Sequence, residues 1–320
     1  MARLENEFAW SISRDKRLRA CARQYWFQHY GMWHGWEDGA PQRTREAYVL
    51  SKLKGRAAWV GIRVHECIAR SLQNLRRGQE VLPVDEILKI VRGEMRTDFA
   101  NSRRRHYRAA PKKYVGLFEH EYDLPVPDVE WKRSAELADE CLRNFYASET
   151  FARLRSLPKE AFVEVEEKRT HFTFEGVKVW ASLDCAVREA DATIIYDWKT
   201  GDAGENHSVQ LTCYALYGSQ AWSLPPDKMR LVEYNLRGGQ PREYGITPKE
   251  IESVQAYIRG SIADMRALLE ESARNTPRPE DAFATTDDDR TCRRCNYLKI
   301  CPRGGQILPA MRAPPAHDTV

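Results

Sequence analysis

The sequence predicts an α/β fold, in which strands in the second half of the chain meet helices that come before and after them. Residues 180–201 read as two short strands joined by a tight turn at Glu189-Ala190-Asp191, because apolar residues alternate before the turn and form a run after it. Apolar residues at helical spacing predict helices over residues 44–78 and 248–272. Cysteines near the C-terminus are expected to join the end of the chain to its beginning through a shared metal centre.

The predicted hairpin carries the clearest candidate chemistry. If Ala190 and Asp191 form its loop, Asp184 faces Asp197, and Lys199 lies on the same face as Asp197 because side chains alternate along a strand. Directly opposed carboxylates destabilise a sheet unless a cation holds them, and such oxygen ligands suit Mg²⁺ or Mn²⁺. The alternative is a surface hairpin with solvated charges, and a loop one residue longer would shift this register.

Composition bounds the class of protein. The chain has 320 residues, of which 42% are hydrophobic and 30% charged, and its net charge of +4 is too mild to indicate a nucleic-acid partner by itself. The N-terminus has no signal-peptide pattern, and no apolar run approaches the roughly 18 residues of a membrane span. We therefore expect a cytoplasmic protein with no membrane partner, whose eight cysteines are thiols or metal ligands rather than disulfides.

Further elements are predicted around the hairpin. Residues 162–180 alternate well and are expected to form one strand of the same sheet, with Glu164 and Glu166 on one face. A second hairpin is expected to turn at Gly238-Gly239, and further helices are expected over residues 84–107 and 130–151. His65 lies beside the apolar stripe of the helix predicted over residues 44–78, where a single histidine is more often structural than a ligand.

Two further patterns point toward a nucleic acid. The helix predicted over residues 84–107 becomes strongly basic at its end and beyond, where the cations are Arg103, Arg104, Arg105, Arg108, Lys112 and Lys113. Such cations neutralise phosphates and the interleaved rings can stack on unpaired bases, although a solvated loop explains the run equally well. Beyond the hairpin, Gln210, Tyr214 and Tyr217 share one helical stripe, which suggests an amide and a phenol directed at the candidate site.

The cysteines fall into two groups. Cys292, Cys295 and Cys301 form a C-x2-C-x5-C pattern that indicates a metal centre, and Cys21 is the best candidate for a fourth ligand. Zinc and an iron–sulfur cluster both accept four thiolates, so spacing alone leaves the two open. The other four cysteines lie within apolar patterns and are expected in the core.

In their joint order, these motifs resemble a known family. His65, Asp184, the run Asp197-Trp198-Lys199-Thr200-Gly201 and Gln210-x-x-x-Tyr214 resemble the PD-(D/E)XK nuclease superfamily, most closely its RecB-type branch. The four cysteines are similar to those of the iron–sulfur nucleases of that branch, which include CRISPR-adaptation nucleases and subunits of helicase–nuclease complexes. The sequence departs from the pattern at Ala181, where glycine is usual, and at Ala22, where proline is usual.

The resemblance implies a role for each matching residue. His65, Asp184 and Asp197, with the backbone carbonyl of Trp198, would hold Mg²⁺ or Mn²⁺. Lys199 would position or activate the attacking water, and Gln210 and Tyr214 would orient the site or the bound strand. Cys21, Cys292, Cys295 and Cys301 would hold a [4Fe–4S] cluster, with Zn²⁺ as the alternative.

The resemblance also implies an architecture, namely a restriction-endonuclease-like core with a central mixed sheet flanked by helices. We expect an N-terminal segment over residues 1–34, a helical region over 35–158, the nuclease core over 159–280, the cysteine segment over 281–308 and a disordered tail over 309–320.

The function expected from this resemblance is that of a metal-dependent DNA nuclease. It would act on single-stranded DNA or DNA ends, as an exonuclease, in DNA repair, recombination, phage or defence processing. The alternative is a non-cleaving, nucleic-acid-binding subunit of a larger repair or defence complex. DNA is the expected partner, and the lack of a P-loop motif leaves a helicase partner open.

Overall fold

The main sheet has five strands and carries the predicted hairpin. The computed structural model describes residues 4–166, 170–201 and 208–313. The strand order is β2-β5-β6-β7-β8, with β2 at Phe162–Val165, β5 at Cys185–Glu189, β6 at Ala192–Lys199, β7 at Met229–Asn235 and β8 at Gln240–Tyr244. Neighbouring strands are antiparallel except β6 and β7, which are parallel. The sheet is therefore mixed, as the sequence predicts.

The register of the central hairpin agrees with the prediction. Cys185 pairs with Tyr196 and Glu189 pairs with Ala192, which leaves Ala190 and Asp191 as the loop. Ala190 has a φ of 50°, as a tight two-residue turn requires. The hairpin turning at Gly238-Gly239 is likewise present as β7 and β8.

A second sheet of three strands stands beside the first, in the order β1-β4-β3, with β1 at Ala9–Trp10, β3 at His171–Phe174 and β4 at Val177–Trp180. The prediction of one continuous strand over residues 162–180 is therefore wrong. Glu175 and Gly176 both have positive φ, at 47° and 76°, and turn the chain into the β3–β4 hairpin. Glu166, with a φ of 40°, lies beyond the end of β2 and does not continue the strand of Glu164.

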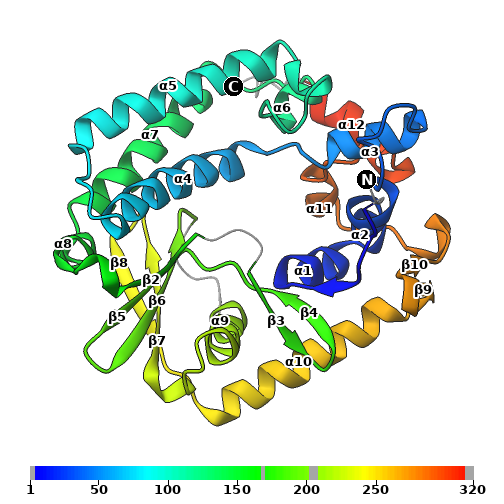
Figure 1. Cartoon of the computed structure of the whole chain (residues 1–320). Coiled ribbons are helices and arrows are strands. Elements are labelled where there is room, and N and C mark those ends of the chain that lie inside the picture. Colours follow the sequence, from blue (N-terminus) through cyan, green and yellow to red (C-terminus); the bar gives the residue numbers. More distant parts are fainter. Residues whose placement is uncertain (1–3, 167–169, 202–207, 314–320) are drawn as a thin grey trace, which may run out of the picture.

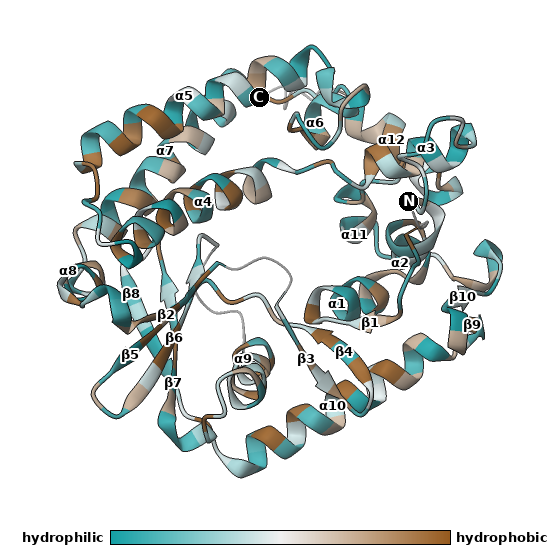
Figure 2. Cartoon of the chain, in the orientation of Figure 1, coloured by the Kyte–Doolittle hydropathy of each residue, from teal (hydrophilic) through white to brown (hydrophobic). Residues whose placement is uncertain are grey.

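The helices surround both sheets. They are α1 Ile12–Ala20, α2 Ala22–Trp26, α3 Gln42–Leu50, α4 Arg56–Arg76, α5 Val84–Arg103, α6 Phe118–Glu121, α7 Asp128–Tyr146, α8 Glu149–Ser156, α9 Ser208–Ala221, α10 Pro248–Arg266, α11 Asp289–Arg293 and α12 Pro302–Arg312. Figure 2 shows hydrophobic and hydrophilic residues alternating along α4, α5 and α10. None of the helices in the described ranges combines the length and apolarity needed to cross a membrane.

Several predicted boundaries differ from the structure. The helix expected over residues 84–107 ends at Arg103, and the helix expected over 130–151 ends at Tyr146, after which α8 is a separate helix. The helix expected over residues 44–78 is interrupted between α3 and α4, because the backbone of Lys54 bonds to Gly116 and Phe118 instead of to its own helix. The helix expected over 248–272 ends at Arg266, and Leu269–Glu271 form β9, which pairs with β10 at Thr276–Pro277. The tail was expected from Pro309, but α12 continues through Pro309 to Arg312, and residues 314–320 lie outside the described ranges.

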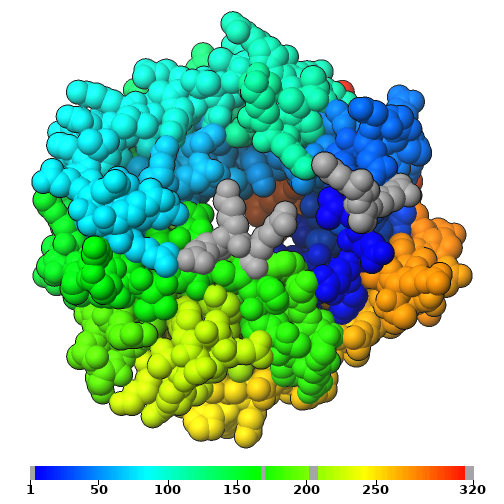
Figure 3. Space-filling view, in the orientation of Figure 1, coloured from blue at the N-terminus to red at the C-terminus, as the bar shows by residue number. Residues whose placement is uncertain are grey.

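The elements are arranged around a central hollow. In Figure 1, α4, α5 and α7 lie along one side, the five-stranded sheet and α9 along the next, α10 along the far edge, and the N- and C-terminal helices close the circuit. The space-filling view is hollowed at the same place, between α4 and α1 (Figure 3). The N-terminal helices therefore pack beside the C-terminal ones, although the chain between them passes through the whole fold.

Candidate active site and cysteine pocket

The two predicted carboxylates come from adjacent strands of the main sheet. Asp184 directly precedes β5, and its Oδ2 accepts a hydrogen bond of 2.7 Å from the backbone N–H of Trp198 on β6. Its own carbonyl accepts from the N–H of Glu166 at 2.9 Å, so the end of β2 fixes its backbone. Asp197 lies within β6 with only 2% of its surface exposed. The sheet thus holds both carboxylates at one end of the hairpin.

Three further side chains converge on Asp197. Lys199, two residues along the same strand, places its Nζ 2.6 Å from Oδ2 of Asp197. Gln210 and Tyr214 lie one turn apart on α9, and each donates a hydrogen bond of 3.2 Å to Oδ1 of Asp197. Gln210 also donates to the hydroxyl of Tyr214 at 2.6 Å and accepts from Lys199 at 3.3 Å. The amide and the phenol predicted from the helical stripe therefore do face the charged end of β6.

His65 reaches the same place from α4. Its Nδ1 lies 3.1 Å from Oδ1 of Asp184. One turn before His65, α4 passes close to Thr200, the residue after Lys199. A Cβ added to Gly61 would lie 3.2 Å from the Thr200 hydroxyl. A larger residue at this position would require the Thr200 side chain to shift by a few tenths of an ångström, so Gly61 suits the close approach of α4 to this segment.

The electrostatics of this cluster reflect crowded, buried charge. Burial, and then repulsion by Asp184, raises the pKa of Asp197 despite the nearby ammonium of Lys199. Burial opposes protonation of His65, but attraction to Asp184 and the hydrogen bond between them raise its pKa above the ordinary value. Burial also raises the pKa of Tyr214 well above its usual range, so its hydroxyl stays a hydrogen-bond donor. Two carboxylates held this close favour a bound cation.

The donor set fits a divalent cation of the magnesium type. Oxygen ligands predominate, and the buried Oδ2 of Asp197 has the ammonium of Lys199 at 2.6 Å. As the side chains stand, no group of three or more His, Cys, Asp or Glu residues within the described ranges closes around a single point. The side chain of Trp198 is buried and stacks on Tyr196 with ring centroids 5.2 Å apart, so only its backbone faces the carboxylates.

Two acidic residues near this cluster were not predicted as site residues. Glu233 on β7 lies opposite Asp197 in the parallel ladder and is buried, which puts its side chain on the same face. Glu164 on β2 is also buried and accepts a hydrogen bond of 2.7 Å from Tyr217 on α9. The alternation of β2 marked Glu164 in the sequence, whereas nothing in the sequence indicated that β7 would pair with β6.

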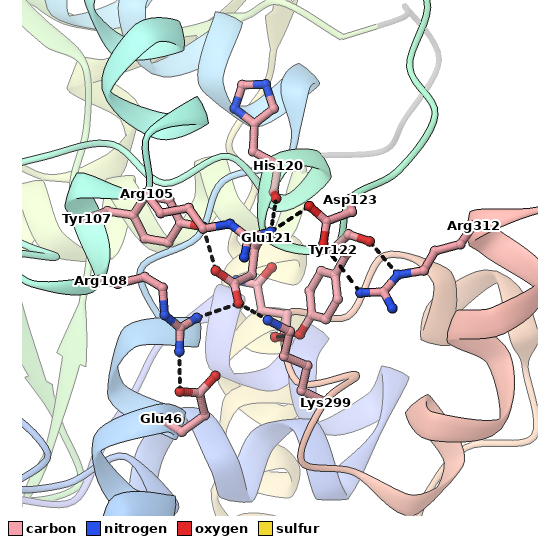
Figure 4. Close-up of polar contacts among 11 residues, drawn as sticks. Glu46, Arg105, Tyr107, Arg108, His120, Glu121, Tyr122, Asp123, Lys299 and Arg312 are labelled. Carbon is pink, nitrogen blue, oxygen red and sulfur yellow. Dashed lines mark hydrogen bonds and ion pairs between the residues drawn. The ribbon is translucent and has the colours of Figure 1, made fainter.

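The predicted basic patch divides into two parts. Arg105 pairs with Asp123 at 2.5 Å, while Arg108 pairs with Glu46 at 2.6 Å and with the fully buried Glu121 at 2.5 Å (Figure 4). Both arginines are therefore already engaged in ion pairs within the chain. Arg103, Arg104, Lys112 and Lys113 are exposed.

The four predicted cysteines line one small pocket. Cys21, between α1 and α2, lines this pocket together with Cys292, Cys295 and Cys301. All are free thiols, and the pKa of Cys295 is raised to about 12 by burial and by the other three cysteines. The four thiols line the same pocket, but as the side chains stand they do not close around a single point within the described ranges. Cys67, Cys141, Cys185 and Cys213 are buried away from this pocket, as expected of core residues.

Comparison with known proteins agrees with this geometry. The search of curated proteins gives no match. The family model of the PD-(D/E)XK nuclease superfamily matches residues 9–302, which include the carboxylates, the lysine, the α9 residues and all four cysteines of the pocket. With a match over most of its length, the chain belongs to the PD-(D/E)XK nuclease superfamily.

Proposed function

We propose that the protein is a metal-dependent deoxyribonuclease that hydrolyses phosphodiester bonds in single-stranded DNA or at DNA ends. The observation that carries the proposal is the convergence of Asp184, Asp197, Lys199 and Gln210 at one end of β6. Exonucleolytic action and a role in repair, recombination, phage or defence processing follow from the likeness to the RecB-type branch.

Each residue has a task that its surroundings support. Asp184 and Asp197, with His65, would hold Mg²⁺ or Mn²⁺, which stabilises negative charge on the phosphoryl oxygens and acidifies a bound water. Lys199 is close enough to Asp197 to donate to the scissile phosphate or to orient the nucleophile. Gln210 and Tyr214 are positioning residues, since they hold Asp197 by hydrogen bonds to Oδ1.

The test is cleavage of end-labelled single-stranded and double-stranded DNA, with and without Mn²⁺. Wild-type protein is expected to cut only with the metal, whereas Asp184→Asn and Lys199→Ala are expected to lose cleavage by about 10³-fold or more while still binding DNA. Cutting by either variant at the wild-type rate would show that the assignment is wrong. Binding without any cutting by the wild type would favour a non-cleaving subunit of a larger complex.

We also propose that the cysteine pocket holds a [4Fe–4S] cluster that clips the N-terminal segment to the C-terminal one. Four free thiols around one pocket support this proposal, as does the likeness to the four-cysteine nucleases. Protein purified without oxygen should be brown and contain iron and acid-labile sulfide in near-equal amounts. Stoichiometric zinc without sulfide would show that the pocket holds a zinc ion and not a cluster.

A further inference from the structure

Five neighbouring cations form a row from α1 to the loop that follows α5. This cation row consists of Arg14 and Arg17 on α1, Lys54 and Lys52 before α4, and Lys112 in the loop that follows α5. Arg14 and Arg17 are one turn apart on α1. The backbone of Lys54 bonds to Gly116 and Phe118, which brings the segment between α3 and α4 against the loop that contains Lys112.

Successive members of the row are close enough to repel one another. Burial, and then the charge of Arg17, lowers the pKa of Lys54. Burial, followed by Lys54 and Lys112, lowers the pKa of Lys52. The pKa of Arg14 is also lowered, chiefly by burial. Each side chain of the row therefore has another cation of the row nearby.

Within the described part of the chain, no carboxylate forms an ion pair with any of the five. Arg14 donates instead to the carbonyl of Ala9 at 2.8 Å, and Arg17 lies 3.2 Å from Nε2 of His29. The pKa of His29 is well below its ordinary value because of burial and both arginines, so the ring is neutral and compensates neither charge. Arg105 and Arg108 of the predicted basic patch have the opposite character, since each is neutralised by a carboxylate. Four of the five, all but the exposed Lys112, are partly buried. Partly buried cations without carboxylate partners are costly unless a ligand supplies the anion.

Aromatic rings lie between the cations. Lys52 Nζ is 5.3 Å from the ring centre of Tyr48, and Lys112 Nζ is 6.0 Å from that of Trp36. Trp36 is only partly buried and contacts Trp33 edge-on at 5.1 Å. Tyr48 is buried, so Trp36 is the ring that a base could reach. Surfaces that bind unpaired strands combine cations for the phosphates with such rings for the bases.

The helix that carries Arg14 and Arg17 begins beside the candidate active site. The first turn of α1, at Ser11–Ser13, lines a pocket together with Gln210, Tyr214 and Trp180 that contains about 830 Å³ of empty space, including space open to solvent. Trp180 is partly exposed at the end of β4, so its ring borders the same pocket as the candidate active-site residues. In Figure 3, the N-terminal helices in blue form one wall of the hollow.

We propose that the cation row is a track for the phosphate backbone of a single DNA strand, leading along the hollow to the candidate active site, with Trp36 and Trp180 as platforms for unpaired bases. This inference rests on the proposed nuclease function and names the path of its substrate. It moves the main nucleic-acid contact from the predicted basic patch to α1 and the segment before α4, with Lys112 common to both.

The test measures binding of a labelled single-stranded oligonucleotide in metal-free buffer containing EDTA, between about 50 and 200 mM salt. Each phosphate contact contributes about 0.7 to the slope of log K against log salt for a single strand. Lys52→Ala/Lys112→Ala is therefore expected to reduce the magnitude of that slope by about 1.4, and Lys54→Ala by about 0.7. The control Lys89→Ala/Lys132→Ala removes two exposed charges from α5 and α7 and is expected to leave the slope unchanged.

Equal slopes for the wild type, the track variants and the control would overturn the inference, provided that all unfold at the same temperature. Binding of a blunt duplex as tightly as the single strand, with the same loss in the variants, would also overturn it. The assay requires no cleavage. Changed slopes in a protein that fails to cut with Mn²⁺ would thus reject the nuclease function while keeping the track.

Discussion

At the scale of single residues, Asp197 links the fold to the proposed chemistry. Its carboxylate is buried and its pKa is raised by burial and by Asp184, so ionising it costs stability. The metal-free protein should therefore lose stability as the pH rises from the ordinary carboxyl pKa through the raised value of Asp197. A bound divalent cation would remove this penalty because it favours the ionised form.

We predict that Mn²⁺ at about 100 times its Kd raises the free energy of unfolding by about 2.7 kcal/mol at neutral pH. The gain should shrink as the pH falls through the raised pKa of Asp197, since protons then compete with the metal. Asp197→Asn should abolish the gain, whereas Asp191→Asn in the exposed turn of the same hairpin should keep it. Denaturant unfolding with and without Mn²⁺ measures this gain in the wild type and in both variants. If Asp197→Asn gains as much unfolding free energy from Mn²⁺ as the wild type, the metal binds elsewhere.

At the scale of elements, a buried ion network joins α6 to the N-terminal and C-terminal parts of the chain (Figure 4). Glu121 at the end of α6 is fully buried and accepts from Tyr107, Arg108 and Lys299. Burial opposes its ionisation, but the bonds from Lys299, Tyr107 and Arg108 outweigh this and lower its pKa. The stability that Glu121 contributes is therefore present above the unfolded glutamate pKa and is lost as the pH falls through the lowered folded value.

Glu121→Gln is expected to cost about 3–5 kcal/mol of unfolding free energy at pH 7, because it leaves cations at a buried position without their anion. The difference in unfolding free energy between Glu121→Gln and the wild type should become smaller at acid pH. Asp123→Asn is the matched control, since its pair with Arg105 is exposed and should be worth less than about 1 kcal/mol. Urea unfolding compares the two, and a Glu121→Gln cost as small as that of the control would show that the network is not important for stability.

At the scale of the whole molecule, the N-terminal segment around α2 contacts the C-terminal segment around residues 280–297. Arg23 donates to the carbonyl of Phe283 at 2.9 Å and pairs with Glu280 at 3.0 Å, and the ring of Phe27 stacks on Tyr297 at 5.0 Å. The cysteine pocket lies at this junction. A cluster bound there would add a cross-link between segments nearly the full length of the chain apart.

Cys21→Ser is expected to lose the iron and sulfide of the proposed cluster, to unfold at a lower temperature and to expose its N-terminal segment to proteolysis. The active-site residues are not part of this junction, so the loss should act through the fold. Cys141→Ala, a change in the core away from the pocket, should retain its iron. Full iron content in Cys21→Ser would mean that Cys21 is not a ligand.

The sequence determined those features that depend on neighbouring residues. A two-residue loop set the hairpin register, so Asp197 and Lys199 could be placed on one face and Asp184 beside them. Helical spacing likewise put Gln210 and Tyr214 on one stripe, because residues four apart share a helix face. The C-x2-C-x5-C spacing identified a local group of thiols in the same way.

Only the tertiary structure decided which distant segments meet. The parallel pairing of β6 with β7 places Glu233 beside Asp197, and the packing of α3 beside the segment after α5 pairs Arg108 with Glu46. Parallel strands need a long crossover, and an ion pair depends on which side chains fold together, so neither has a local signal. For the same reason the sequence could not show that Arg105 and Arg108 pair with carboxylates while Lys52 and Lys54, within the described residues, do not. A run of basic residues looks the same in the sequence whether or not the fold brings a carboxylate to it.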